Sequence, residues 1–131
     1  MQRQAVNPWD WSLPLGYNQG EVISGGTRRL ICAGQTAVDA QGAPQHAGDM
    51  RGQIALALEN LRAVLAAADM GPGDVVRLGV YTTDAGAALA EFDLMGQMFG
   101  PAGVAPPMTL LEVKGLALPG LMFEIEATAE A

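Results

Sequence analysis

The feature that most constrains this chain is a pair of strand-like stretches near its C-terminus, 108–114 and 121–127, joined by a short link containing Gly and Pro. Successive side chains of a β-strand point to opposite faces, so alternating apolar and polar residues indicate a strand with one buried face. Glu124 and Glu126 share one face of the second stretch. The function of this stretch depends on whether the face with the two glutamates is solvated or lines a pocket. The opposite, apolar positions are Leu121, Phe123, Ile125 and Ala127.

Composition limits the classes of protein to consider. The 131 residues suffice for a single domain, 1–131, with a sizeable core. Half of the residues are hydrophobic and only 16% are charged. Such a thin charged surface indicates that other subunits cover some apolar surface. The formal charge of -7 argues against nucleic-acid binding, because a phosphate-binding surface needs clustered Lys and Arg.

The single cysteine and the lengths of the apolar runs indicate the cellular compartment in which the protein is expected. Cys32 cannot form an intramolecular disulfide, which indicates a reducing environment. No apolar run has the length of a membrane span or of a signal-peptide core. We therefore expect a cytoplasmic protein that does not bind membranes.

The other elements follow from turn residues and periodicity. Residues 17–24 and 29–33 alternate well enough for two strands, and Gly25 and Gly26 between them predict a hairpin. The nearly continuous apolar run at 74–83 predicts a strand covered on both faces.

Two helices are expected from apolar stripes at helical spacing. Asp49 is the expected N-cap of the first, which ends by Met70, and the second begins near Asp84. The first stripe is Met50, Ile54, Leu58, Leu61 and Leu65, and the second is Ala88, Phe92, Met95 and Phe99.

The predicted order, β-β-α-β-α-β-β, is typical of an α+β domain with two helices packed on one face of a mixed β-sheet. The other face carries Ala, Leu and Met as well as Glu, so we expect oligomerisation to cover it. Residues 1–16 have no clear period and are expected to form an irregular arm. Trp9 and Trp11 either pin this arm to the body or place one ring in the wall of a ligand cleft.

Few residues in the sequence point to chemistry. There is no phosphate-binding loop, and one His with one Cys lacks the clustered ligands of a metal site. A Cys32–His46 nucleophile pair is disfavoured, because Cys32 lies in an apolar strand and His46 in a loop. Glu124 and Glu126 are either both solvated or desolvated by a neighbouring subunit, which would suit a carboxylate to proton transfer. Tyr17 is either a packed ring or a hydrogen-bond donor in a cleft.

Four segments in order resemble the Rid proteins, the reactive-intermediate deaminases also called the YjgF family: LGYNQG at 15–20, ICAGQ at 31–35, DVVRLGVYTTD at 74–84 and LMFEIEATA at 121–129. The resemblance implies a homotrimer of chorismate-mutase-like α+β subunits, with an inner barrel of sheets and small-molecule clefts at the subunit interfaces. It also implies hydrolysis of enamines or imines, such as 2-aminoacrylate, to a keto acid and ammonia, without a metal or organic cofactor.

The resemblance also assigns roles to individual positions. Tyr17 matches the tyrosine of the family's G-x-Y-x-Q segment, and Glu124 matches the glutamate proposed to position the hydrolytic water. We expect these two to be the catalytic residues. At the position of the family's carboxylate-gripping arginine this chain has Met108. The remaining substrate-binding positions are Thr109, Gly34, Gln35, Ala33 in place of a serine, Leu110 in place of a cysteine, and Asp93 or Phe92 in place of a helix asparagine.

Losing the arginine removes charge-assisted hydrogen bonds, each of roughly 1.5–3 kcal/mol. The sequence therefore favours an enzyme acting on a neutral or cationic, more apolar imine, enamine or related unsaturated compound. In this hypothesis Glu124 orients or deprotonates water, Tyr17 hydrogen-bonds the ligand, and Thr109 or backbone amides hold a carbonyl. The alternative is a non-catalytic trimer that binds a small metabolite or a partner protein in the same cleft.

Overall fold

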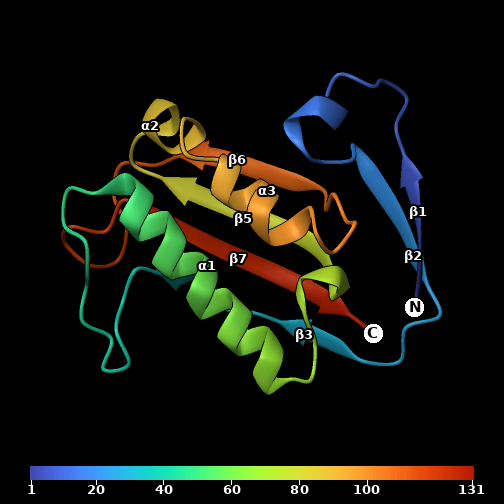
Figure 1. Ribbon diagram of the computed structural model, residues 1–131, viewed down its shortest axis with the longest axis horizontal. Helices are drawn as coiled ribbons and strands as arrows, with labels where there is room; N and C mark the ends of the chain where they lie inside the picture. The colour runs from blue at the N-terminus through green and yellow to red at the C-terminus, as the bar shows by residue number, and fades with distance from the viewer.

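The computed structural model describes all residues, 1–131, and arranges them as one mixed sheet, one small strand pair and three helices (Figure 1). The helices are α1 (Met50–Ala67), α2 (Ala85–Leu89) and α3 (Asp93–Phe99). The strands are β1 (Gln2–Val6), β2 (Gly20–Ser24), β3 (Arg29–Ile31), β4 (Gln35–Thr36), β5 (Val75–Thr82), β6 (Met108–Glu112) and β7 (Phe123–Glu130).

β7 is the strand on which the main sheet is built. The strand order is β3-β7-β5-β6, and β4 pairs with a separate part of β7. β5 and β6 are parallel, joined by the α2–α3 crossover, whereas every pairing of β7 is antiparallel. The prediction of a mixed sheet is therefore confirmed. β5 separates β6 from β7 although the two follow each other in sequence (Figure 1).

The helices cover one face of this sheet, and the core lies between the two layers (Figure 1). The predicted alternation of the last strand is correct, because its apolar side chains are buried towards the helices. Phe123 and Ile125, the two large ones, contribute about 1.5–3 kcal/mol each when fully buried. The centre of the core consists of Phe123, Ile125, Ala127 and Ala129 from β7 and Ile54, Leu58, Leu61 and Leu65 from α1.

α1 begins where the sequence predicts. The Asp49 carboxylate accepts a hydrogen bond from the Gly52 N–H at 2.9 Å, which satisfies one of the free donors of the first turn. Gln53, fully buried one turn later, donates to the Gly120 carbonyl and accepts from the Met122 N–H, both at 2.8 Å. The start of α1 thus fixes the chain that enters β7. None of the helices is both long and apolar enough to cross a bilayer.

The predicted hairpin of 17–24 with 29–33 is wrong. β2 pairs with β1, a strand within the segment expected to be irregular, and β3 pairs with β7. β1 escaped prediction because it is largely exposed and has no apolar alternation. It is held by Arg3, which pairs with Glu21 at 3.0 Å and donates to the carbonyls of Gly73 and Val75 at 2.8 and 2.9 Å.

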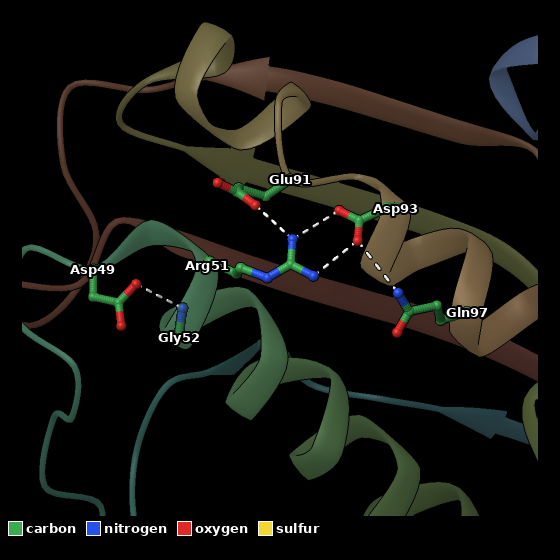
Figure 2. Close-up of polar contacts among 6 residues, drawn as sticks. All are labelled: Asp49, Arg51, Gly52, Glu91, Asp93 and Gln97. Carbon is green, nitrogen blue, oxygen red and sulfur yellow. Dashed lines mark hydrogen bonds and ion pairs between the residues drawn. The ribbon is translucent and has the colours of Figure 1, made fainter.

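The predicted second helix is divided into α2 and α3. Asp84 caps α2, as expected, by accepting from the Ala87 N–H at 3.0 Å. The chain then turns at 90–92, and Arg51 of α1 binds Glu91 at 2.6 Å and Asp93 at 2.8 Å (Figure 2). Residues two apart on a continuous helix point about 200° apart. One guanidinium can therefore hold both carboxylates only because the helix is broken between them.

We predict that Asp49→Ala lowers the free energy of unfolding by about 1 kcal/mol, because the N-terminal turn of α1 loses its side-chain acceptor. Urea denaturation followed by circular dichroism measures the change. Asp49→Asn is the matched control, since asparagine keeps an acceptor oxygen at the cap. Equal loss in both variants would show that the cap hydrogen bond does not stabilise this helix.

Candidate functional site

The face of the sheet opposite the helices has no covering layer within the subunit. Large apolar side chains lie on it, with Ile31 70% and Leu111 50% exposed. The polar side chains of the same face come from alternate positions of β5, β6 and β7. This surface, termed here the open face, contains Arg77, Tyr81, Thr109, Leu111, Glu124, Glu126 and Ile31. Large apolar side chains exposed together on one face suit a covered surface better than one in contact with water.

Glu124 lies directly over Gly34 on the open face. The carboxylate of Glu124 occupies the space that a side chain at position 34 would take: a Cβ there would lie 2.7 Å from the Glu124 Cδ and closer still to Oε2. Only glycine leaves room for this arrangement. The next two residues, Gln35 and Thr36, pair with Ile125 and Glu124 as β4. The structure therefore brings together Gly34 and Glu124, two residues that the sequence links to one site.

The neighbouring residues of this turn are open to the surface. Ala33 is exposed, and the Gln35 side-chain amide donates to the Ala33 carbonyl at 3.3 Å. Cys32 is buried, and burial raises the pKa of its thiol. His46 is exposed in a distant loop, so the disfavoured Cys–His pair is not formed. No three His, Cys, Asp or Glu side chains come together in a geometry that could hold a metal ion.

Glu126 is held in a second carboxylate arrangement. It lies over Gly79, where an added Cβ would be 2.7 Å from its Oε1, and the Tyr81 hydroxyl donates to that oxygen at 2.7 Å. This hydrogen bond, together with desolvation, raises the pKa of Tyr81 above its ordinary value of 10.0. Glu126 and Tyr81 therefore hold each other in place beside Glu124.

Arg77 and Tyr81 are site residues that the sequence interpretation missed. The Arg77 guanidinium donates to the Thr109 hydroxyl at 2.7 Å, and both residues line a cavity of about 400 Å³ on the open face with Tyr81 and Glu126. The sequence does contain a pattern that indicates these residues, because Arg77, Gly79 and Tyr81 alternate with the buried Leu78 and Val80. The nearly continuous apolar run obscured this alternation and led to the prediction that both faces of the strand are covered, which is wrong for the subunit.

Tyr17 and Met108 lie on the helix side of the sheet, away from Glu124. Met108 and Leu110 pair with Leu78 and Val80, whose side chains are buried towards the helices. They line a second cavity, of about 650 Å³, which we call the apolar cavity. Its walls are Pro14, Leu15, Tyr17, Leu89, Phe92, Met108 and Leu110. Glu124 lines a different cavity, of about 360 Å³, on the open face with Tyr81 and Glu126. Within one subunit, therefore, the two expected catalytic residues, Tyr17 and Glu124, line different cavities.

Neither Trp9 nor Trp11 lines the apolar cavity, although Trp11 contacts Tyr17, which does. Trp9 is 62% and Trp11 57% exposed, so neither ring is buried within the subunit. Trp11 contacts Tyr17 edge-on, with ring centroids 6.2 Å apart. Of the two candidates for the helix position, Phe92 lines the cavity. Asp93 instead faces Arg51, whose hydrogen bonds lower the pKa of its carboxyl group (Figure 2).

The family model described as Endoribonuclease L-PSP matches residues 14–131. A crystal structure of YyfB from Yersinia pestis, a protein of the conserved Rid family, is 35% identical over the whole of both chains, with a TM-score of 0.82. This chain belongs to the Rid family, also called YjgF. Both the resemblance drawn from the four motifs and the predicted α+β fold are confirmed.

Other relatives of this Rid protein extend the comparison. Protein DfrA of Myxococcus xanthus is 30% identical over 131 residues, which cover 98% of this chain and 96% of the relative. TdcF of E. coli, solved with bound serine, is 29% identical and has a TM-score of 0.70. The match covers 88% of this chain and 87% of the TdcF chain. The match to a full-length Rid structure includes the β1–β2 pair, which lies partly outside the span of the family model.

We predict that Tyr81 of this Rid protein ionises above pH 10, because its proton is held by the Glu126 carboxylate. Absorbance titration, with Tyr81→Phe identifying the signal, measures the midpoint. Glu126→Gln should lower it. A raised folded-state pKa means that the stabilisation is complete below pH 10 and is lost as pH rises through the folded value. An unchanged midpoint in Glu126→Gln would contradict the assigned hydrogen bond.

Proposed function

We propose that this Rid protein is a homotrimer with small-molecule clefts at its subunit interfaces, and that it hydrolyses an imine, an enamine or a related unsaturated metabolite. The observation that supports this most directly is the Glu124 carboxylate lying over Gly34 on the open face. A catalytic carboxylate must be held in position while remaining accessible to water and substrate. A glycine beneath it and a second strand beside it provide that positioning.

The proposed reaction requires one water and one proton relay. Glu124 accepts a proton from water as the water oxygen attacks the carbon of the C=N bond, and Glu124 passes this proton to the nitrogen. The resulting carbinolamine then loses ammonia: the C–N bond breaks, the hydroxyl proton is transferred through Glu124 to the departing nitrogen, and a C=O bond forms. An enamine first takes a proton on carbon and becomes the imine. These steps use general acid–base chemistry and need no metal or organic cofactor.

A site that uses both Tyr17 and Glu124 needs two copies of the chain. Within one subunit the two residues line different cavities, separated by the sheet. The apolar side chains of the open face, Ile31 and Leu111 among them, favour burial against a neighbour. In the proposed trimer, Glu124 and Gly34 of one subunit would face Tyr17 and Met108 of the next across the cleft.

The substrate is expected to differ from a simple amino-acid-derived imine. TdcF binds serine, which carries a carboxylate. Here Met108 stands where the family's deaminases have their carboxylate-binding arginine, and it lies in the apolar cavity. Arg77 is near in space, but it is on the opposite side of the sheet and donates to Thr109. This arrangement favours a neutral or cationic substrate with apolar character.

Met108 also supports an alternative function, a non-catalytic trimer that binds a small metabolite or a partner protein in the same cleft. Cleavage of RNA, the activity named in the description of the family model, is disfavoured by charge. The net charge is -7, and Arg3, Arg29 and Arg51 are engaged in ion pairs with carboxylates. A phosphate-binding surface needs free basic residues in a cluster.

Glu124→Gln tests the catalytic proposal. We expect at least about a hundredfold loss of ammonia release from carboxylate-free imines, because the amide cannot accept a proton. Gly34→Ala should cause a comparable loss without removing the carboxylate, since the new Cβ displaces it. The matched control is Glu59→Gln, which alters an exposed carboxylate on α1. An unchanged rate in Glu124→Gln would exclude the proposed role, and wild-type protein that binds but releases no ammonia would favour the alternative.

The assembly is tested by mass in solution. We expect the wild-type protein to have about three times the subunit mass of 13.6 kDa, and Ile31→Lys to shift it towards monomer, because the new charge is placed on the open face. Ala63→Lys, which adds the same charge on the exposed side of α1, should leave the mass unchanged. A monomeric wild-type protein at micromolar concentration would contradict the interface cleft.

A further inference from the structure

The apolar cavity adjoins a smaller cavity of about 270 Å³. The smaller cavity lies between α3 and the segment before β6. Pro14, Leu15, Phe92 and Met108 line both cavities, so their side chains form the partition between them. Leu15 and Leu89 are exposed and lie at the mouth of the apolar cavity, whereas Phe92 and Met108 are half-buried at its base.

The lining of the apolar cavity restricts what it can hold. It has no charged side chain, and the Tyr17 hydroxyl is the one polar side-chain group among its seven residues. Its volume lies within the range of small-molecule sites, and a dry apolar cavity of roughly 150 Å³ already binds benzene. A carboxylate placed there would lose its hydration without gaining a cationic partner. An aromatic or branched aliphatic group of one ring's size fits both the volume and the chemistry.

The position of Phe92 is determined by its two neighbours in sequence. Glu91 and Asp93 are both bound by Arg51, at 2.6 and 2.8 Å, and Gln97 donates to Asp93 at 3.3 Å (Figure 2). With both flanking side chains held on the α1 side, the intervening Phe92 is directed the other way, into the partition between the cavities. A bidentate arginine pair fixes geometry more firmly than a single ion pair. Arg51 is thus a positioning residue for Phe92.

We infer that the apolar cavity is the subsite for an uncharged hydrocarbon substituent of the substrate, such as an aryl group beside the C=N carbon, and that Phe92, positioned by Arg51, sets its maximum size. This inference rests on the proposed function, of which it specifies the substrate class. The reacting carbon then lies towards Tyr17 at the polar end of the cavity, and the hydrocarbon group lies against Phe92 and Met108.

Ketones test the subsite separately from catalysis, because they resemble the product and bind without turnover. Titrations followed by NMR on the wild-type protein should show acetophenone binding roughly ten- to a hundredfold more tightly than acetone. Phenylpyruvate, which adds a carboxylate, should bind more weakly than acetophenone, and Met108→Arg should reverse that order. Equal affinity for acetone and acetophenone would overturn the subsite.

Two substitutions test Phe92 and Arg51. Phe92→Ala removes part of the partition, so the affinity ratio of 2-acetonaphthone to acetophenone should rise by about tenfold. Arg51→Gln should raise the same ratio by a smaller factor, because Phe92 is no longer held. Arg62→Gln, which changes an arginine of α1 outside any ion pair, should leave it unchanged. A size preference that is unaltered in Phe92→Ala would overturn its assigned role.

The outcomes separate this inference from the proposed function. Tight acetophenone binding without ammonia release from any imine would support the subsite and remove the hydrolytic function. Ammonia release at equal efficiency from imines with and without an aryl group would support the function and overturn the subsite.

Discussion

The burial of one face of β7 beneath α1 is the interaction on which the rest of the structure depends. Phe123, Ile125 and Ala127 fill the layer under the helix, and this commits Glu124 and Glu126 to the opposite face. A shift of one residue in the pairing of β7 would exchange the two sets and place carboxylates in the core. Stability and site geometry are therefore set by the same register. Gln53 reinforces it by fixing the chain just before β7.

Two glycines on neighbouring strands and turns leave space for the carboxylates that the register of β7 places on the open face. Gly34 and Gly79 lie beneath Glu124 and Glu126, where a side chain would displace the carboxylates. Neither has a backbone conformation that requires glycine, so their role is to leave space. The resulting open face combines two carboxylates, an arginine and exposed Ile31 and Leu111. The exposed Ile31 and Leu111 favour covering of this face by a second subunit, and the two glycines hold the carboxylates close to the backbone.

The sequence predicts those parts of the fold that are set by periodicity within one element. The stripe of α1, its Asp49 cap and the alternation of β7 are correct because each depends on neighbours three, four or two residues away. The hairpin prediction fails because β2 pairs with β1, and Arg3 of β1 makes contacts with Gly73 and Val75 that lie far along the chain. Likewise, the family motifs place Gly34 with Glu124, but motif order cannot show that Tyr17 lies across the sheet from Glu124.

The break between α2 and α3 shows how a stability device and a binding surface are coupled. The apolar stripe through Ala88, Phe92 and Met95 would suit a continuous helix, yet the structure places Glu91 and Asp93 on the same guanidinium. An exposed ion pair contributes little free energy by itself. Its geometric consequence is larger, because holding residues 91 and 93 together determines where Phe92 points. The charged residues on the outer surface thereby shape an uncharged cavity. A substitution of Arg51 would change the size of the ligand group that the cavity accepts more than it would change the stability of the fold.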